Sequence, residues 1–202
     1  MNLSNRLAKL YDIAEGQAGY FTTAQAVAAG VDRRRLAYFT GAGRLQRIRH
    51  GVYRLAQFPH SRHEDLVIAW LATGPDSVIS HESALVLYDL SDVLPAAIHV
   101  TVPSTASRRH PGLRLHTNQI SAQEITYYDD LPVTTVARTI ADVILAGLAD
   151  ELVEQAVQEA VHNGLVTPTL LLATAEPRGP RVRRIMRRAL ERIGQLSNQE
   201  PS

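Results

Sequence analysis

The sequence predicts an α+β protein, in which residues 1–57 form a winged helix-turn-helix and residues 58–202 form a mixed α/β domain. Three observations lead to this expectation. Two short helical segments meet near residue 30, a basic β-hairpin follows them, and helix-like and strand-like segments alternate through the rest of the chain. With 202 residues, of which 45% are hydrophobic, the chain is long and apolar enough for two compact units.

A helical hairpin is expected in residues 20–41. Thr22 is followed three residues later by Gln25, which is the pattern of a capping box at the start of a short alanine-rich helix. That helix should end near Gly30, and Asp32 is placed to cap a second helix. An amphipathic helix is expected to precede them, because leucines recur at helical spacing in the first ten residues.

The second helix of this hairpin has an apolar and a basic face. Leu36 and Phe39 fall on the inward face at helical spacing. The outward face and its flanks carry Arg33, Arg34, Arg35 and Tyr38. A recognition helix contacts base edges in the major groove with its N-terminal half, and arginine can bond guanine bidentately. Three adjacent arginines also occur on ordinary solvated helix faces, so the helix alone leaves both interpretations open.

The segment QRIRHGVYRL predicts the wing of this fold, a hairpin that turns at His50–Gly51. In the resulting register the opposed pairs are Ile48 with Tyr53, Arg47 with Arg54, and Arg49 with Val52. Like charges that face each other across a strand pair are destabilising, so three arginines on one hairpin face make sense if phosphate oxygens lie between them. A slip of one residue in the register would turn these arginines inward.

The second region is expected to begin after a linker at residues 56–62. Helices are expected in residues 63–73, 80–90, 134–147, 149–164 and 181–193, and after Thr167–Pro168. Strands are expected in residues 98–103 and 113–120 and from residue 131. Arg138 and Asp142 are spaced i, i+4, which predicts a modest surface ion pair with a structural role.

Charge is distributed unevenly along a chain whose formal net charge is only +1. Seven of the 21 basic residues lie in residues 32–55 and seven more in residues 178–192, whereas residues 139–176 hold six acids and no Lys or Arg. The second basic cluster could extend a DNA footprint, bind RNA or face solvent, and the sequence does not decide among these. We predict a second phosphate-contact surface there, at Arg184, Arg187 and Arg188. The acidic segment fits either a basic cleft on a partner protein or an ordinary solvated face.

Features of common enzyme classes are missing from the sequence. The only lysine is Lys9, whereas a restriction-like nuclease commonly needs a lysine near clustered carboxylates that hold Mg²⁺. No phosphate-binding G-x-x-x-x-G-K-[ST] or G-x-G-x-x-G motif occurs. Asp129 and Asp130 are adjacent, so in a strand they would point to opposite faces. We therefore expect no catalytic residue and no cofactor.

Histidine and cysteine usage also indicates no metal site. The chain has no cysteine, which excludes disulfides and thiolate sites and fits a reducing compartment. His60 and His63 are spaced i, i+3, but they lie in or beside the linker and no acid or histidine nearby completes a ligand set. In the segment His81-Glu82-Ser83, the serine is better explained as part of a helix start than as a nucleophile.

Four segments together resemble a known family. GYFTTAQAVAAGVDRRRLAYFTGAGRLQRIRHGVYRL is followed by VISHESALVLYDL, IHVTVP and LPVTTVARTIADV, in an order similar to that of the AbiEi antitoxins. These proteins are the transcriptional-regulator halves of bacterial AbiE-type toxin-antitoxin operons. The resemblance covers about residues 5–165, and G-R-L-x-R-I-R-x-G-V-Y-R is its most specific motif.

The resemblance implies a cytoplasmic antitoxin that binds operator DNA to repress its operon and counteracts a nucleotidyltransferase toxin encoded beside it. The expected DNA contacts, carried over by position, are Arg33, Arg34, Arg35, Tyr38, Arg47, Arg49 and Arg54. The implied C-terminal antitoxin domain follows in residues 58–202. A ligand-responsive winged-helix regulator without a toxin partner is the alternative. No membrane partner is expected, because the leucines of the first helix alternate with charged residues.

Overall fold

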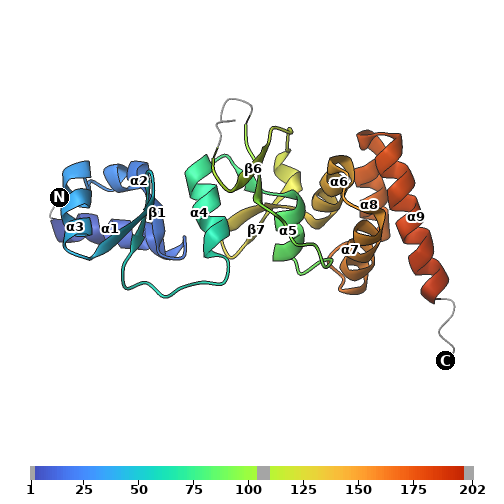
Figure 1. The fold of residues 1–202 in the computed structure, drawn as a ribbon, viewed down its shortest axis with the longest axis horizontal. Coiled ribbons are helices and arrows are strands. Elements are labelled where there is room, and N and C mark those ends of the chain that lie inside the picture. Colours follow the sequence, from blue (N-terminus) through green and yellow to red (C-terminus); the bar gives the residue numbers. More distant parts are fainter. Residues whose placement is uncertain (1–2, 104–109, 198–202) are drawn as a thin grey trace. The chain divides into compact units, whose positions relative to one another are not determined.

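The computed structural model describes residues 3–103 and 110–197 (Figure 1). The chain forms two compact units, and the expected α+β class is confirmed. The first unit comprises residues 1–77 and 127–131, and the second comprises residues 78–126 and 132–202. None of the helices in the described ranges has the length and apolar character needed to cross a membrane.

The first unit contains helices and a small antiparallel sheet. Its helices are α1 (Leu3–Glu15), α2 (Thr23–Ala28), α3 (Arg33–Gly41) and α4 (Glu64–Thr73). Its strands are β1 (Tyr20–Thr22), β2 (Leu45–Arg49) and β3 (Val52–Leu55), in the order β1-β3-β2. Leu10, Phe21, Leu36 and Phe39 lie in the core that joins α1, α3 and the sheet. Three helices followed by a β-hairpin are the arrangement of a winged helix-turn-helix.

Both predicted helix caps in this unit are confirmed. The Thr22 hydroxyl accepts a hydrogen bond from the Gln25 backbone N–H at 3.2 Å, and the Gln25 side chain accepts one from the Thr22 N–H at 2.8 Å. The Asp32 carboxylate accepts from the Arg35 N–H at 2.9 Å. These bonds satisfy N–H groups that have no partner inside a helix, so they fix where α2 and α3 begin.

Helix α4 is part of the first unit, whereas the sequence analysis placed the domain boundary before it, between residues 57 and 58. The helix packs on β1 and β3, and the Tyr20 hydroxyl donates to the Glu64 carboxylate at 3.0 Å. Burial of the phenol and this hydrogen bond raise the pKa of Tyr20 to about 12. The contact is between residues far apart in sequence, so helical periodicity gave no sign of it.

The second sheet has the strand order β6-β5-β4-β8-β7. Its strands are β4 (Val78–Ile79), β5 (Ile98–Thr101), β6 (Leu113–His116), β7 (Ile125–Tyr128) and β8 (Leu131–Thr134). Strand β4 is antiparallel to β5 and parallel to β8, and β5 is parallel to β6. Asp129 and Asp130 connect β7 to β8 with φ values of 47° and 62°, so they form a turn and do not occupy the strand positions considered above.

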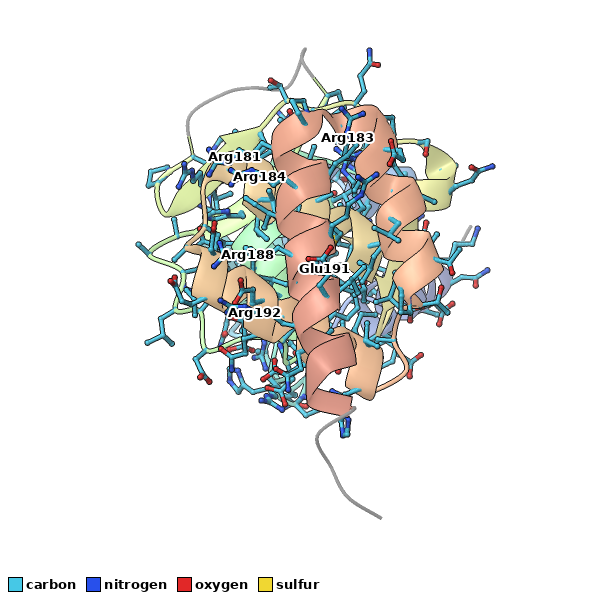
Figure 2. The ribbon with its side chains drawn as sticks, turned by 90° about the vertical axis from the view of Figure 1, so that its right-hand side faces the viewer. Arg181, Arg183, Arg184, Arg188, Glu191 and Arg192 are labelled. Atoms are coloured by element: carbon cyan, nitrogen blue, oxygen red, sulfur yellow. The ribbon has the colours of Figure 1, made fainter. Side chains whose placement is uncertain are left out.

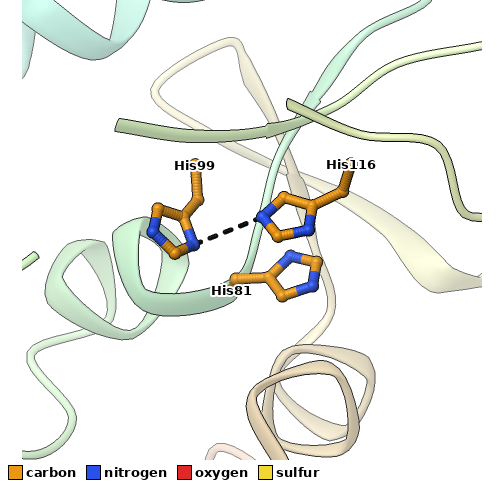
Figure 3. A group of neighbouring side chains, drawn as sticks. All are labelled: His81, His99 and His116. Atoms are coloured by element: carbon orange, nitrogen blue, oxygen red, sulfur yellow. Dashed lines mark hydrogen bonds between the residues drawn. The ribbon is translucent and has the colours of Figure 1, made fainter. Parts of the chain in front are cut away.

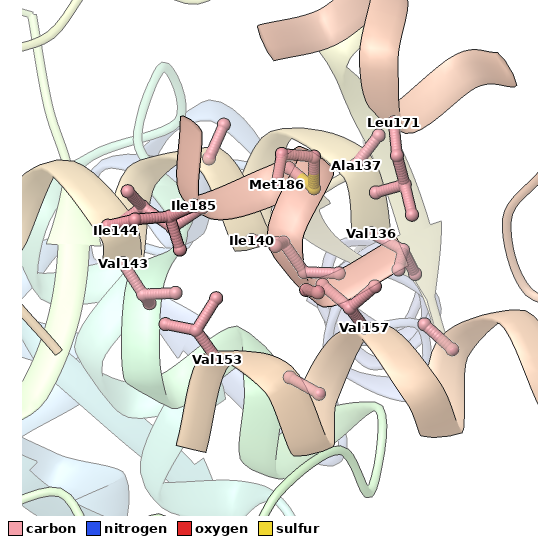
Figure 4. Close-up of a cluster of buried hydrophobic side chains, with 14 of the residues drawn as sticks. Val136, Ala137, Ile140, Val143, Ile144, Val153, Val157, Leu171, Ile185 and Met186 are labelled. Atoms are coloured by element: carbon pink, nitrogen blue, oxygen red, sulfur yellow. The ribbon is translucent and has the colours of Figure 1, made fainter. Parts of the chain in front are cut away.

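Helices of the second unit enclose its larger core. They are α5 (His81–Leu87), α6 (Val136–Ala146), α7 (Asp150–His162), α8 (Pro168–Ala175) and α9 (Pro180–Ser197), with short 3₁₀ turns at Ala122–Glu124 and Glu176–Arg178. Figure 4 shows Ile140, Val153, Leu171 and Met186 from α6, α7, α8 and α9 meeting in this core. Fully burying one such aliphatic side chain contributes about 1.5–3 kcal/mol, so this cluster stabilises the unit.

Arg138 and Asp142 form a buried ion pair, so the expectation of a surface pair is wrong. Arg138 Nε lies 2.9 and 2.8 Å from the two carboxylate oxygens of Asp142, and Nη1 lies 2.9 Å from Glu124 Oε2. Arg178 also forms an ion pair with Glu124, so two guanidinium groups contact this carboxylate. Burial opposes the charge on Arg138, but Asp142 and Glu124 outweigh it and raise its pKa. This network ties α6 to the segment before β7.

Candidate nucleic-acid interface

Helix α3 presents basic and aromatic side chains to solvent. Arg33 and Arg34 are exposed in its first turn, and 71% of Tyr38 is exposed one turn later. Neither guanidinium has a partner among the described residues. Arg35 is half-buried, and its Nη1 lies 3.6 Å from the Asp32 carboxylate. The buried face of the helix consists of Leu36 and Phe39, as predicted. Arg33 and Arg34 are therefore the arginines of α3 that form no ion pair with a described acid of the first unit.

The wing contains a β-bulge that the sequence analysis did not anticipate. Arg49 opposes Val52, but the register shifts between Arg47 and Arg49. As a result Arg47 opposes Tyr53 and Gln46 opposes Arg54, whereas the expected pairs were Arg47 with Arg54 and Ile48 with Tyr53. Ile48 is the extra residue of the bulge and is 39% exposed. In a β-bulge, two residues of one strand oppose a single residue of the partner strand. Beyond the bulge, the side chains of the bulged strand therefore point to the opposite faces of the sheet from those expected.

Arg54 is buried and is a wrong prediction as a DNA contact. Only 2% of it is exposed. Its guanidinium carbon lies 5.7 Å from the centroid of the Tyr20 ring, and its Nη2 donates to the carbonyl oxygen of Phe58. Arg54 lies on the face of β3 opposite Tyr53, as expected, but α4 packs on β1 and β3 and this face is buried.

The remaining predicted wing residues stay accessible. Arg47 is exposed, and its Nη2 lies 3.3 Å from His50 Nδ1. Arg49 is half-buried and engages a neighbour within the structure. Arg44, which the sequence analysis counted among the seven arginines but did not select, is exposed in the segment between α3 and β2. Its position in the sequence could have identified it as a DNA contact, because it lies between two elements that were both predicted to bind DNA.

We call Arg33, Arg34, Arg44 and Arg47 the α3–wing arginines. All four are exposed, and α3 packs directly against β2. Asp32, at the start of α3, is the only acid between residues 20 and 60, and it already caps the helix. Several cations in one region of the surface, with only one acid in the same part of the chain, attract polyanions. Guanidinium groups form hydrogen bonds that suit phosphate oxygens and the edges of guanine bases.

Most arginines of α9, five of which are labelled in Figure 2, form ion pairs with acids of the same unit. Arg187 lies 3.0 Å from Glu176, and Arg188 lies 3.6 Å from Asp150 and 3.4 Å from Glu154. Of the three arginines predicted to form a second nucleic-acid surface, only Arg184 has no acidic partner among the described residues. The acid-rich segment 139–176 thus supplies counter-charges for α9, which the sequence analysis did not foresee.

The histidines that the sequence analysis considered as metal ligands have other partners. His60 Nδ1 lies 2.8 Å from a carboxylate oxygen of Glu64, and the ring of His63 meets that of Tyr128 edge-on. The hydrogen bond from His60 lowers the pKa of Glu64, although partial burial opposes this. No ligand set therefore forms around these two residues within the described part of the chain.

Comparison with known families addresses this part of the molecule. Residues 8–56 match the family model described as "Transcriptional regulator, AbiEi antitoxin". The matched residues, which we call the AbiEi segment, make up about a quarter of the chain. They run from within α1 to the end of the wing and contain all the α3–wing arginines. The match supports a general role in antitoxin function and transcriptional regulation.

One solved structure is similar over most of the chain. It is the crystal structure of the RV2827C protein from Mycobacterium tuberculosis, with a TM-score of 0.56 and 13% sequence identity. The similarity covers 94% of this chain and 77% of that one. At this identity the comparison shows a shared fold beyond the AbiEi segment and nothing about shared activity. Comparison with curated protein sequences gives no match.

Proposed function

We propose that the AbiEi segment binds operator DNA and represses the operon that encodes this protein. The observation that carries the proposal is the exposure of Arg33, Arg34 and Tyr38 on α3 together with Arg47 on the wing. In a winged helix-turn-helix, the recognition helix enters the major groove and its first turns reach base edges. We assign Arg33, Arg34 and Tyr38 to the groove, and Arg35, Arg44, Arg47 and Arg49 to backbone phosphates.

We propose further that the second unit acts as the antitoxin against a nucleotidyltransferase toxin in the cytoplasm. This part rests on the AbiEi match and on the sequence resemblance, because no described residue of the second unit identifies a toxin surface by its chemistry. In the acid-rich segment 139–176, four of the six acids, Asp142, Asp150, Glu154 and Glu176, already pair with arginines.

A mobility-shift titration of the DNA upstream of the gene tests the first proposal. Wild type, Arg34→Ala and Arg47→Ala should be compared at two salt concentrations. Loss of a base contact should weaken specific binding by about 1–3 kcal/mol, whereas loss of a phosphate contact should lower the slope of log K against log salt by about one. Arg114→Ala, a change at an exposed arginine of β6, is the control. Equal binding of upstream and random DNA by wild type would contradict operator recognition.

Co-expression tests the second proposal. The gene next to the one for this chain should encode a nucleotidyltransferase whose induction stops growth, and the full chain should restore growth. An Arg33→Ala/Arg34→Ala/Arg47→Ala variant should still protect cells from a toxin expressed from an unrelated promoter, because repression is then bypassed. Failure of the wild-type chain to protect, with both proteins present at normal levels, would contradict the antitoxin role.

A cavity in the first unit favours the alternative of a ligand-responsive regulator. It has a volume of about 410 Å³ and is lined by Thr22, Gln25, His50, Trp70 and Pro75, among others. The indole Nε1 of Trp70 is buried without a hydrogen-bond partner among the described residues. The size lies in the range of small-molecule sites. Trp70 fluorescence in a metabolite screen tests this alternative, since a ligand that regulates DNA binding should change both the emission and the operator affinity.

A further inference from the structure

Three histidines from separate segments converge in the second unit (Figure 3). His81 is the first residue of α5, His99 lies on β5, and His116 ends β6. His81 and His99 are each only 2% exposed, and His116 is half-buried. They are separated by 17 or more residues in sequence, so no local spacing motif of the kind typical for zinc sites identifies them.

The ring nitrogens lie at distances suited to a shared ligand. One nitrogen from each ring can be chosen so that all three are within 4.8 Å of one another. His116 Nε2 and His99 Nδ1 are 3.4 Å apart. Two nitrogens bound to one tetrahedral Zn²⁺ at about 2.0–2.1 Å lie roughly 3.3–3.4 Å from each other, so this pair is already spaced as two zinc ligands would be.

His81 stacks on His116 and completes the group. Their ring centroids are 3.5 Å apart and the planes differ by 11°. A nitrogen lone pair lies in the plane of its ring, so the His81 ring must turn out of this stack to point at an ion shared with the other two. The backbone of His81 has φ 54°, a conformation that costs energy for a residue other than glycine and often marks functional positions.

Neighbouring polar groups contact the outer nitrogens of two of the rings. His81 Nδ1 lies 2.9 Å from Ser80 Oγ, and Ser80 Oγ accepts from Thr101 Oγ1 at 2.8 Å. In the tautomer that donates from Nδ1 to Ser80, Nε2 of His81 carries the lone pair. His99 Nε2 lies 4.0 Å from the Glu82 carboxylate, too far for a direct hydrogen bond, and Nδ1 of the same ring faces His116. A histidine that binds a metal through one nitrogen usually gives its other N–H to a hydroxyl, carbonyl or carboxylate partner of this kind.

We propose that His81, His99 and His116 form a binding site for a divalent transition-metal cation, with Zn²⁺ as the best fit. Three imidazoles without thiolates suit Zn²⁺, Co²⁺, Ni²⁺ or Cu²⁺ and do not suit Mg²⁺ or Ca²⁺, which prefer oxygen ligands. Three protein ligands leave a fourth tetrahedral position for water, on the half-buried side formed by His116.

A cation bound at this site would also meet the charge of a neighbouring arginine. Arg114, which pairs with His99 across β5 and β6, opposes any cation. Its charge favours an anionic fourth ligand such as hydroxide, which would reduce the net charge of the bound ion.

Metal titration of the full chain tests the site. The protein is treated with EDTA, exchanged into metal-free buffer and titrated with ZnCl₂ by calorimetry, and with CoCl₂ by visible absorption. We expect one equivalent of Zn²⁺ to bind and Co²⁺ to give the bands of a tetrahedral complex. His116→Gln should weaken Zn²⁺ binding by at least about 10-fold. His162→Gln, at an exposed histidine of α7, is the matched control and should bind as wild type does.

Two results would overturn the proposal. The first is a wild-type chain that binds neither ion above the level of a His81→Gln/His99→Gln/His116→Gln variant. The second is binding that His162→Gln reduces and His116→Gln does not. If the His116→Gln variant fails to fold by circular dichroism, X-ray absorption of the wild-type chain with one equivalent of Zn²⁺ decides. Three imidazole nitrogens at about 2.0 Å support the site, and fewer than three contradict it. None of these measurements depends on DNA or toxin binding.

Discussion

The guanidinium of Arg54 lies against the Tyr20 ring, and its Nη2 bonds the Phe58 carbonyl within the first unit. Arg47, seven residues earlier, is exposed on the same hairpin. The two arginines have the same chemistry and opposite environments. Guanidinium groups that are buried against aromatic rings contribute to packing, whereas exposed ones remain free to meet phosphates.

This contrast predicts different salt dependence for two matched variants. Arg47→Met should lower the slope of log K against log salt for operator DNA by about one, because one phosphate contact is lost. Arg54→Met should leave the slope unchanged, because the buried guanidinium reaches no phosphate. Fluorescence anisotropy at four salt concentrations measures both slopes. A reduced slope for Arg54→Met alone would show that Arg54 leaves the core when DNA binds.

The buried pair of Arg138 and Asp142 should matter more for stability than any ion pair of α9. Asp142→Asn removes the negative partner of a buried guanidinium and should lower the free energy of unfolding by about 3 kcal/mol. Asp150→Asn removes a partner of Arg188 at an exposed site and should cost less than about 1 kcal/mol. Urea unfolding at pH 7 measures the free energy of unfolding of both variants. Equal losses would indicate that Asp142 is solvated and would contradict the prediction.

Glu124 gives a pH-dependent contribution to stability. Burial opposes its ionised form, but the Ser121 backbone N–H and the Arg138 guanidinium outweigh it and lower the pKa of Glu124 below its usual 4.5. Its stabilising effect should be complete above pH 4.5 and decline as the pH falls through the lower value of the folded state. The difference in unfolding free energy between wild type and Glu124→Gln should therefore shrink in acid. A difference that stays constant from pH 7 to pH 3 would contradict this.

At the scale of elements, α9 combines an apolar face in the core with arginines on its outer side. Val182, Ile185 and Met186 are buried, while acids of α7 and of the 3₁₀ turn at Glu176–Arg178 neutralise the flanking arginines. The helix thus needs no nucleic acid to explain its arginine content. Arg181 and Arg184, which have no acidic partner among the described residues, are the exceptions.

Two variants of α9 separate these roles. Arg187→Gln/Arg188→Gln should change operator affinity less than two-fold, because both guanidinium groups already have acidic partners. Arg184→Gln should lower the salt slope by about one if α9 contacts phosphates. Anisotropy titrations with the same operator measure both effects. An unchanged slope for Arg184→Gln would remove α9 from the DNA interface.

Elements defined by local chemistry could be predicted, and elements defined by distant contacts could not. Thr22 and Asp32 fix the starts of α2 and α3 through hydrogen bonds to the backbone N–H three residues later. Both caps could therefore be predicted from the sequence. The bulge at Ile48 depends on how the whole sheet packs, so the hairpin was predicted with a wrong register. The two-residue strand β4 is too short to show alternation and was not predicted.

At the scale of the whole molecule, sequence order and spatial grouping differ. The AbiEi segment ends at residue 56, yet the first compact unit extends to Ser77 and includes α4. In the same way, His81, His99 and His116 meet only because α5, β5 and β6 are brought together. Separations of 18 and 17 residues in the sequence carry no periodic signal, so the cluster could be found only from the fold.

Fragments of two lengths test the extent of the first unit. A fragment of residues 1–57 lacks Glu64 and the apolar face of α4, whereas a fragment of residues 1–77 retains both. The shorter fragment should melt at least about 5 °C lower, since even 1 kcal/mol shifts the midpoint of so small a domain by about 4–8 °C. Circular dichroism measures the midpoints. Equal midpoints would show that α4 adds nothing to the winged helix.

Residues 127–131, which contain the β7–β8 turn, count with the first unit, so the polypeptide passes between the two units three times, at residues 77–78, 126–127 and 131–132. The same five residues include the end of β7 and the start of β8. A chimera that takes only residues 1–77 from a relative would therefore combine these five residues with a first unit from the other parent. We expect chimeras to fold best when residues 1–77 and 127–131 come from the same parent.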